Sequence, residues 1–304
     1  SGNWTKDGAA TLYAQWTYDV TEYIVTFGVG TGYTSYGSLS AYNNTTSASI
    51  TSPAQVRSQH SVTFTATPET GYEVEGWYTD AACTEGKHDA GNTTYTTTIT
   101  AATNVYVKFV EKTWSVSFAA TTGGTVEPSA TQTVGEANGI TVIAEAKTGY
   151  TFNGWTSSNG GKFADDQAEE TTFYPTAATT VTASFTENLY AITVKSSDNN
   201  HGTVSQSTDK AGIVTTIEIT ATPKHGYQFV NWTATGGATI ADPNSPETTI
   251  TASATGTVTA NFELIPPTTV YFRPKTKWKN NNPVIICDDN STAVTPYDCS
   301  GNYY

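Results

Sequence analysis

A short signature built on glycine, tyrosine and tryptophan occurs three times in this chain, at intervals of 78 and 77 residues. It reads GYEVEGW at 71–77, GYTFNGW at 149–155 and GYQFVNW at 226–232. Similarity at a fixed period indicates one small structural unit copied in tandem. Because a period of this length is close to the lower limit for an independent domain, we expect several small cores rather than one large core.

Composition favours strands over helices. Only 13% of the residues are charged, 12% are aromatic, and threonine, serine and alanine are frequent. Thr, Val, Tyr, Phe and Trp suit the half-buried surface of a sheet. The net charge of -13 arises from a scarcity of Lys and Arg. It indicates a soluble surface and argues against nucleic acid as a partner, because no basic stripe could neutralise phosphates.

Each unit shows the same succession of strands. An opening strand (23–27, 114–118, 190–194) leads to a glycine-rich turn and a short strand (123–126, 201–204), which is a hairpin signal. A third strand and the signature strand follow, and a closing strand (105–109, 181–185, 258–262) ends the unit with apolar residues on one face. The sequence therefore predicts a mainly β protein made of small β-grasp-like or β-sandwich-like units in an elongated array.

These patterns divide the chain into five segments. Residues 19–111, 112–187 and 188–264 are predicted to be the three units, and 1–18 the C-terminal remnant of a preceding one, since 12–16 repeats the closing pattern. Residues 265–304 follow a change of composition at Pro266-Pro267 and are predicted to begin a different domain. The first unit is longer than the second by about 15 residues, which we expect in a long loop over 31–58.

The links between units are short. Four residues separate the closing strand of one unit from the opening strand of the next, at 110–113 and 186–189. Neighbouring units must nearly touch, so we expect a semi-rigid rod. Val110 and Leu189 are the apolar residues predicted to pack at these joints.

No catalytic, cofactor or metal site is predicted. The histidines, at positions 60, 88, 201 and 225, share no motif position, and the sequence carries no nucleophile elbow, phosphate-binding loop or dinucleotide-binding pattern. Cys83 and His88 lack the paired spacing of a zinc site. Asp165 and Asp198 lie in turns, where aspartate side chains bond to their own backbone, and this explains them without calcium.

Cysteine and hydropathy patterns add two further expectations. Cys287 and Cys299 either form a local disulfide, remain free thiols or pair outside the chain, and these alternatives stay open. No apolar run approaches the roughly 20 residues of a membrane span, and no leader is evident at Ser1. An export signal and an anchor are therefore expected outside this sequence.

The aromatic residues are the best candidates for ligand contact. Aromatic faces bind sugars, but the signature Trp recurs at a fixed place in every unit, which favours a core position with a β-bulge at Gly76, Gly154 or Asn231 turning the ring inward. Tyr33, Tyr36 and Tyr42 lie in the expected long loop and are predicted to contact a partner, as Tyr-, Ser- and Gly-rich loops do elsewhere.

The three copies together resemble the divergent internalin B-repeat, of the Listeria-Bacteroides repeat family. The features that carry the resemblance are the opening strand, the Ala-x-Pro run at 66–68 and 221–223, the signature strand and the closing V-x-A-x-F strand. The middle unit departs from it with Ala146-Lys147 in place of Thr-Pro. The resemblance implies a unit of large exported bacterial surface proteins that serves as a stalk or adhesive segment, without activity, cofactor or metal.

Two functional classes follow. The first is a non-enzymatic stalk or adhesin segment at the bacterial cell surface, which spaces or presents a binding domain and whose partner is a host or bacterial surface protein or a glycan. The second is an accessory region of an exported glycan-active protein, in which a carbohydrate-binding module begins after residue 267. Trp278, a further candidate contact residue, motivates this second hypothesis together with Tyr271 and Tyr297.

Overall fold

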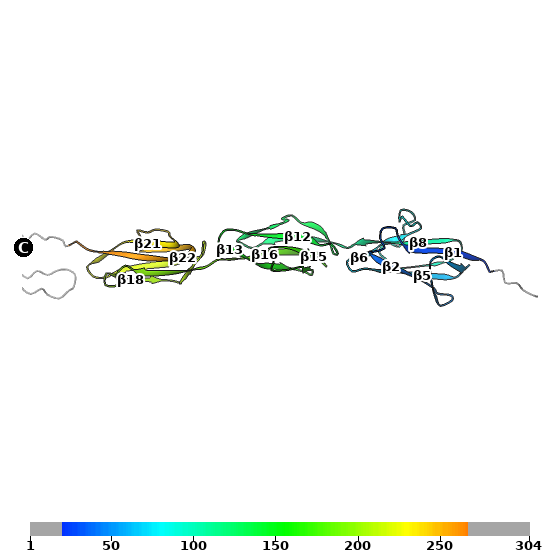
Figure 1. Ribbon diagram of the computed structural model, residues 1–304, viewed down its shortest axis with the longest axis horizontal. Coiled ribbons are helices and arrows are strands. Elements are labelled where there is room, and N and C mark those ends of the chain that lie inside the picture. The colour runs from blue at the N-terminus through cyan, green and yellow to red at the C-terminus, as the bar shows by residue number, and fades with distance from the viewer. Residues whose placement is uncertain (1–19, 267–304) are drawn as a thin grey trace, which may run out of the picture.

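A computed structural model describes residues 20–266, which form three all-β units arranged end to end (Figure 1). Each unit has its own core, and the three cores lie within the three predicted units. Every named element is a strand. The mainly β, tandem architecture predicted from the sequence is confirmed.

The first unit is a sandwich of two four-stranded sheets. One sheet has the order β4-β1-β8-β6 and the other β3-β2-β5-β7. The core lies between them, since it draws on both, for example on Val25 and Val107 from one sheet and Phe64 from the other. The strands are β1 (Glu22–Val29), β2 (Gly37–Asn43), β3 (Ala48–Ile50), β4 (Ala54–Arg57), β5 (Ser61–Pro68), β6 (Tyr72–Tyr78), β7 (Thr94–Thr98) and β8 (Thr103–Glu111).

The second unit repeats this arrangement, with the sheets β11-β9-β16-β13 and β10-β12-β15-β14. Val116, Trp155 and Phe173 are among the residues buried between them. The strands are β9 (Thr113–Ala120), β10 (Gly124–Glu127), β11 (Gln132–Gly135), β12 (Ile140–Ala146), β13 (Tyr150–Ser157), β14 (Lys162–Phe163), β15 (Glu170–Tyr174) and β16 (Thr179–Glu187).

In the third unit two long strands run through both layers. The first part of β22 pairs with β20, its last part pairs in parallel with β17, and β21 pairs with it along both parts. The sandwich alternative of the prediction therefore describes all three units. The strands are β17 (Tyr190–Ser196), β18 (Gly202–Gln206), β19 (Lys210–Ala211), β20 (Ile217–Pro223), β21 (Tyr227–Ile240) and β22 (Glu247–Leu264).

The opening and closing strands of each unit are parallel neighbours. Val25 lies opposite Thr103, Val116 opposite Thr179, and Ile192 opposite Gly256. Two parallel neighbours begin at one end of a sheet and finish at the other. The chain therefore enters each unit at one end and leaves it at the opposite end, which sets consecutive units in a line.

The signature tryptophans lie in the cores, as the sequence predicted. The exposed fractions of Trp77, Trp155 and Trp232 are 0%, 3% and 2%. The register of the signature strand shifts just before Gly76, Gly154 and Asn231, so the expected bulges are present. Each bulge adds one residue to the strand, which reverses the face of the residues that follow and turns the indole ring inward.

The predicted glycine hairpin is wrong. The short strands β10 and β18 pair with β12 and β20 and not with the opening strands before them. The turn therefore carries the chain to the other sheet in the second unit, and to the β20 side of the six-stranded sheet in the third. Close packing accounts for the glycine that begins each short strand. A Cβ atom on Gly37, Gly124 or Gly202 would lie 2.2–2.5 Å from the ring of the closing-strand phenylalanine.

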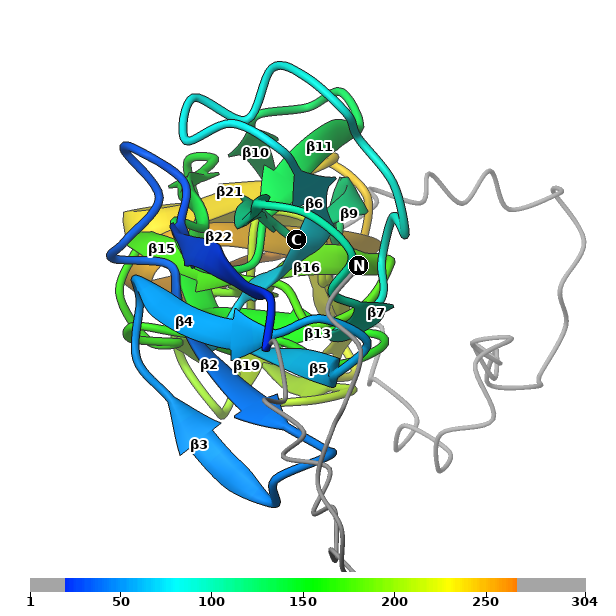
Figure 2. The same cartoon turned by 90° about the vertical axis from the view of Figure 1, so that its right-hand side faces the viewer.

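The insertion in the first unit is also not the long loop that was expected. Within 31–58 the chain forms β2, β3 and β4, and β2 pairs with β3 in antiparallel register. Viewed along the rod, this hairpin projects from one side of the unit (Figure 2). The Ser and Asn residues of this stretch are therefore divided between strands and the turns that join them.

Candidate functional site: the joints between units

The contacts that hold one unit against the next follow one plan at both joints. We call the contact between the first and second units joint 1, and that between the second and third joint 2. At each, the residue after the closing strand donates its N–H to the carbonyl of the signature glycine, from Lys112 to Gly71 and from Asn188 to Gly149, both at 2.8 Å. This bond fixes where the chain leaves the unit.

A glutamate at the end of the closing strand accepts hydrogen bonds from the next unit. At joint 1, Glu111 Oε1 accepts the backbone N–H groups of Ala137 (2.9 Å) and Asn138 (2.7 Å). Its Oε2 accepts the side-chain amide of Asn138 at 2.7 Å. The acceptor comes from one unit and all three donors from a turn of the next.

Glu187 makes the same kind of contact at joint 2. Its Oε1 accepts the backbone N–H groups of Val214 (2.5 Å) and Thr215 (3.1 Å), and its Oε2 accepts the Thr215 hydroxyl at 2.6 Å. Desolvation acts to raise the pKa of Glu187, but hydrogen bonds from Thr215, Val214 and Ile213 outweigh it, so the pKa lies below its ordinary value. The ionised carboxylate is therefore the form that joint 2 stabilises.

Glycine makes room for both carboxylates. A Cβ atom on Gly135 would lie 2.2 Å from Glu111 Oε1, and one on Gly212 would lie 2.3 Å from Glu187 Oε1. Real Cβ atoms essentially never come this close to another heavy atom. Each joint therefore consists of a glutamate on one unit and a glycine-led turn on the next.

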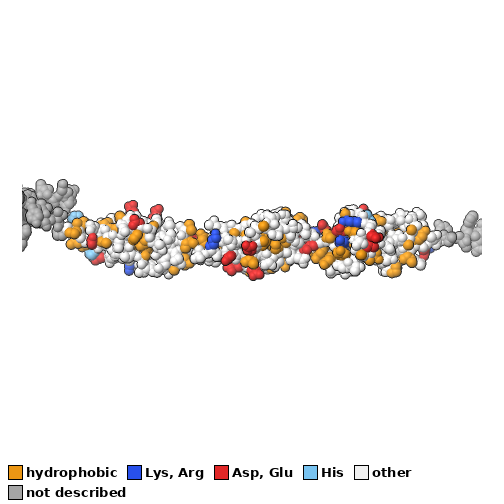
Figure 3. Space-filling model, turned by 90° about the horizontal axis from the view of Figure 1, so that it is seen from above, with side chains coloured by type: hydrophobic (Ala, Val, Ile, Leu, Met, Phe, Trp, Pro, Cys, Tyr) orange, Lys and Arg blue, Asp and Glu red, His pale blue; other side chains and the backbone are white. Residues whose placement is uncertain are grey.

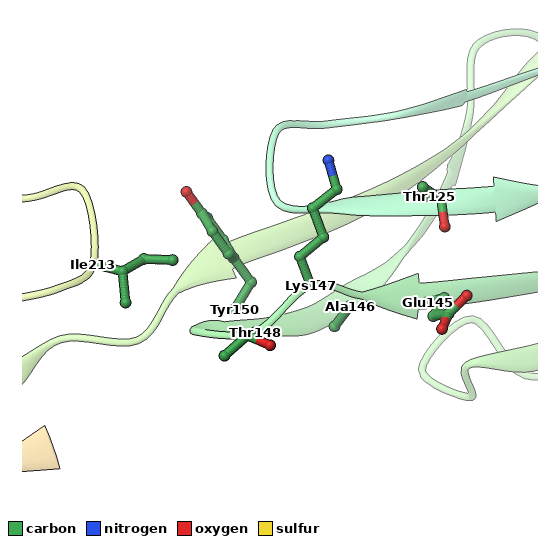
Figure 4. Close-up of a pocket in the computed structure, with 7 residues that line it drawn as sticks. All are labelled: Thr125, Glu145, Ala146, Lys147, Thr148, Tyr150 and Ile213. Carbon is green, nitrogen blue, oxygen red and sulfur yellow. The ribbon is translucent and has the colours of Figure 1, made fainter. Parts of the chain in front are cut away.

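Packing beside the hydrogen bonds completes each joint. A Cβ on Gly71 would meet Ala137 at 3.0 Å, and one on Gly149 would meet Ile213 at 2.7 Å. At joint 2, Ile213 points toward the ring of Tyr150 and lines an open pocket with it and with Lys147 (Figure 4). Leu189 remains 48% exposed, so the sequence-based prediction of an apolar joint at Val110 and Leu189 missed the polar contacts that dominate.

The third unit lacks the glutamate. Leu264 lies opposite Tyr227, as Glu111 lies opposite Tyr72 and Glu187 opposite Tyr150. The backbone bond is kept, because Ile265 donates to Gly226 at 2.8 Å. The carboxylate contact therefore distinguishes the two joints from the same position at the end of the third unit.

The tyrosines predicted to contact a partner fall into two groups. Tyr36 stacks on Tyr72 with ring centroids 4.5 Å apart, and Lys108 Nζ lies 5.4 Å from the ring centroid of Tyr33. These contacts cover faces that a ligand would use, and both tyrosines are half-buried. Tyr42 on β2 is 43% exposed and borders an apolar groove with Phe27. Trp278 lies outside the described residues, as do Cys287 and Cys299.

Three titratable side chains of the first unit form a polar network beside Cys83. Glu75 accepts hydrogen bonds from Tyr78 and Lys87. Burial, and then the bond to Glu75, raise the pKa of Tyr78. Burial likewise raises the pKa of the Cys83 thiol, which disfavours the reactive thiolate. The network fits a structural role.

The remaining candidates for metal chemistry lie apart. His88 contacts Asp89 and the ring of Tyr95, whereas His60 accepts a bond from Asn43. Asp165 and Asp198 bond to the backbone two residues on, as predicted for turn residues. Within residues 20–266, no group of three or more His, Cys, Asp or Glu side chains is placed to hold a metal ion.

The divergent InlB B-repeat domain model matches residues 39–113, 114–189 and 192–266. The chain belongs to this family. The three matches fall on the three structural units, and the first match begins within β2 and so leaves out β1. Both joints are therefore contacts between consecutive B-repeats.

Other comparisons add less. A crystal structure of the pilus adhesin SpaC from Lactobacillus rhamnosus GG, in its open conformation, matches with 10% identity and a TM-score of 0.24. The match covers 83% of this chain and 44% of that chain, and a TM-score of this size does not indicate a common fold. A comparison with curated proteins gave no match. Among the described residues of the B-repeat array, no helix is long and apolar enough to cross a membrane.

The sequence contained a signal for the joint residues that was not recognised. Two residues after the closing phenylalanine, the first two B-repeats carry glutamate and the third carries leucine. A glycine follows 24 or 25 residues after each glutamate. The pairing was not apparent because its two members belong to different units, and comparison within single repeats does not connect them.

Proposed function

We propose that this chain is a non-enzymatic stalk segment of a large exported bacterial surface protein, where it holds a binding domain away from the cell or contributes to adhesion itself. The observation that carries the proposal is the pair of matching joints. Each joint sets one B-repeat in line with the next through several directional hydrogen bonds. A connection of this kind keeps the array extended over its full length. Units joined by free linkers would not maintain a fixed span.

The acidic, sparsely charged surface supports the same proposal. Charged side chains are spread thinly over the visible face of the rod (Figure 3). A net charge of -13 keeps neighbouring copies apart through mutual repulsion, which suits a crowded surface. For direct adhesion, the exposed Tyr42 and the groove beside it are the proposed contact surface on the first B-repeat.

Location and binding are tested separately. Antibodies raised against the purified chain should label intact cells of the source organism, and protease added outside those cells should remove the label. Labelling that requires permeabilised cells would contradict the proposal. A glycan and matrix-protein array with the purified chain distinguishes adhesion from spacing. Binding that Tyr42→Ala reduces, and Tyr174→Ala on the second repeat does not, would assign adhesion to the Tyr42 surface.

A further inference from the structure

We propose that Glu111 and Glu187 are acid-sensitive latches, which hold consecutive B-repeats in one orientation while ionised and release them when protonated. This inference concerns the mechanics of the rod and does not depend on what the rod carries. Its basis is that each carboxylate accepts several hydrogen bonds from a turn of the next repeat. At joint 1 these are two backbone N–H groups and one side-chain amide. At joint 2 they are two backbone N–H groups and a hydroxyl.

Protonation changes what such a site can hold. An ionised carboxylate only accepts hydrogen bonds, whereas the protonated form carries an O–H donor on one oxygen. On Oε1 that hydrogen would face backbone N–H groups, which cannot accept it. On Oε2 of Glu187 it would face the Thr215 hydroxyl, which could accept it only by giving up its own donation to that oxygen. Hydrogen bonds to a charged acceptor are also roughly twice as strong as those to a neutral one. The protonated glutamate therefore holds the turn of the next repeat more weakly.

The direction of the pH effect follows from the lowered pKa of Glu187. A carboxyl group whose pKa is depressed by a contact stabilises that contact above its ordinary pKa of 4.5 and loses the stabilisation as the pH falls through the lowered value. The latch at joint 2 is therefore closed at neutral pH and opens in acid below the ordinary range. At joint 1 the carboxylate of Glu111 likewise accepts hydrogen bonds from two backbone N–H groups and one side chain of the next repeat.

Other titratable groups lie near the joints, and their effect on the pH dependence must be distinguished from that of Glu111 and Glu187. Tyr72, whose pKa is raised by desolvation and then by Glu111, remains neutral throughout the range. Two lysines also lie near the joints, Lys112 in the link and Lys147 beside Tyr150. Two further carboxyl groups lie near the joints, Glu136 on the turn at joint 1 and Glu145 in the pocket at joint 2. Each needs its own control.

Hydrogen exchange of the full chain at pH 7 tests each latch separately. Glu111→Gln imitates the neutral form and should speed exchange of the amides at 137–138 by about tenfold or more, the usual effect of losing charge-assisted bonds. It should leave 214–215 unchanged. Glu187→Gln should do the reverse, so each variant is the matched control for the other. If neither turn loses protection, the latch is refuted.

A second variant reaches the same contact from the opposite side. Gly135→Ala removes no charge, but its Cβ would displace the Glu111 carboxylate, so it should also deprotect 137–138. Unchanged exchange in β9 and β16 shows that the second repeat remains folded. Protection at 137–138 that survives both Glu111→Gln and Gly135→Ala would overturn the assignment.

Small-angle scattering tests the dependence on acid. The wild-type chain should lose the longest distances of its distance distribution between pH 7 and pH 3, with tryptophan fluorescence reporting that the cores stay folded. The double variant Glu111→Gln, Glu187→Gln should show that loss at pH 7 and change little on acidification. Glu136→Gln and Glu145→Gln should behave as wild type. A wild-type rod that keeps its full length at pH 3 would refute acid release.

Discussion

The indole N–H of each signature tryptophan donates to a backbone carbonyl of the same repeat. The acceptors are Asn92, Ala168 and Ser245, at 3.0, 2.9 and 3.0 Å. The indole N–H of a buried tryptophan usually has a partner, because leaving it unpaired costs free energy. The carbonyl in each case lies on the loop before the next strand. The residue therefore fills the core and fastens a loop to it, which explains its presence in all three copies.

Replacing Trp155 with alanine should destabilise the second repeat by about 3–5 kcal/mol, because a large buried ring is lost and a cavity remains. Trp155→Phe keeps much of the apolar area and should cost less. Urea unfolding of the full chain, with hydrogen exchange reporting on β13 and β16, measures the change in that repeat alone. A stability that is unchanged in Trp155→Ala would indicate a ligand platform in place of a core residue.

Gly124→Ala tests the close approach of a short strand to the core. Its Cβ would lie 2.2 Å from the ring of Phe185, so the change should destabilise the second repeat by about 1–3 kcal/mol through overpacking. Adding Phe185→Leu removes the obstacle and should recover part of the loss. If Gly124→Ala alone is neutral by the same unfolding measurement, the glycine has another role.

At the scale of single residues, the sequence predicted the tryptophans and missed the reason for the glycines. Burial of Trp77, Trp155 and Trp232 was predictable because the residue recurs at the same place in every repeat, next to a residue that can form a bulge. The requirement at Gly124 arises from Phe185, which is 61 residues away in the chain. Only the fold brings that ring against the glycine, so no local pattern could reveal it.

Among the elements, the β2–β3 hairpin distinguishes the first repeat. Its turn is held by the buried Asn43, whose Oδ1 accepts the N–H groups of Thr45 and Thr46 and whose Nδ2 donates to His60 at 3.1 Å. The Asn side chain thus satisfies the turn and ties the hairpin to the chain before β5. The local composition was interpreted as a loop because Ser, Asn and Gly are also turn residues.

Asn43→Ala should destabilise the hairpin by about 1–3 kcal/mol, since buried donors and acceptors lose their partner. Hydrogen exchange should increase over 43–50 while β12 and β16 of the second repeat stay protected. Asn44→Ala, which alters an exposed side chain bonded to Ser61 and Thr63, is the matched control and should have a smaller effect. Equal effects of the two substitutions would contradict this role for Asn43.

For the whole molecule, the line of units follows from topology and the joints together. The parallel pairing of opening and closing strands places the two ends of each repeat far apart, and Glu111 and Glu187 fix the next repeat there. Short links in the sequence were sufficient to predict a rod. They could not predict its polar joints, because these depend on turns of the following unit. The assignments of 1–18 to a preceding repeat and of 265–304 to a different domain stay predictions, because the structure describes only residues 20–266.

Small-angle scattering of the wild-type chain at neutral pH tests the rod most directly. An opening strand of about eight residues and a link of four residues, at ~3.3 Å per residue, give each B-repeat a length of about 40 Å along the rod. The three B-repeats therefore span about 120 Å, and a rod of that length has a radius of gyration of about 35 Å. The distance distribution should fall slowly toward long distances, with a narrow cross-section. A single compact domain of this chain length would have a radius of gyration of about 19 Å and a symmetric distribution, and that result would contradict both the rod and the stalk function proposed for it.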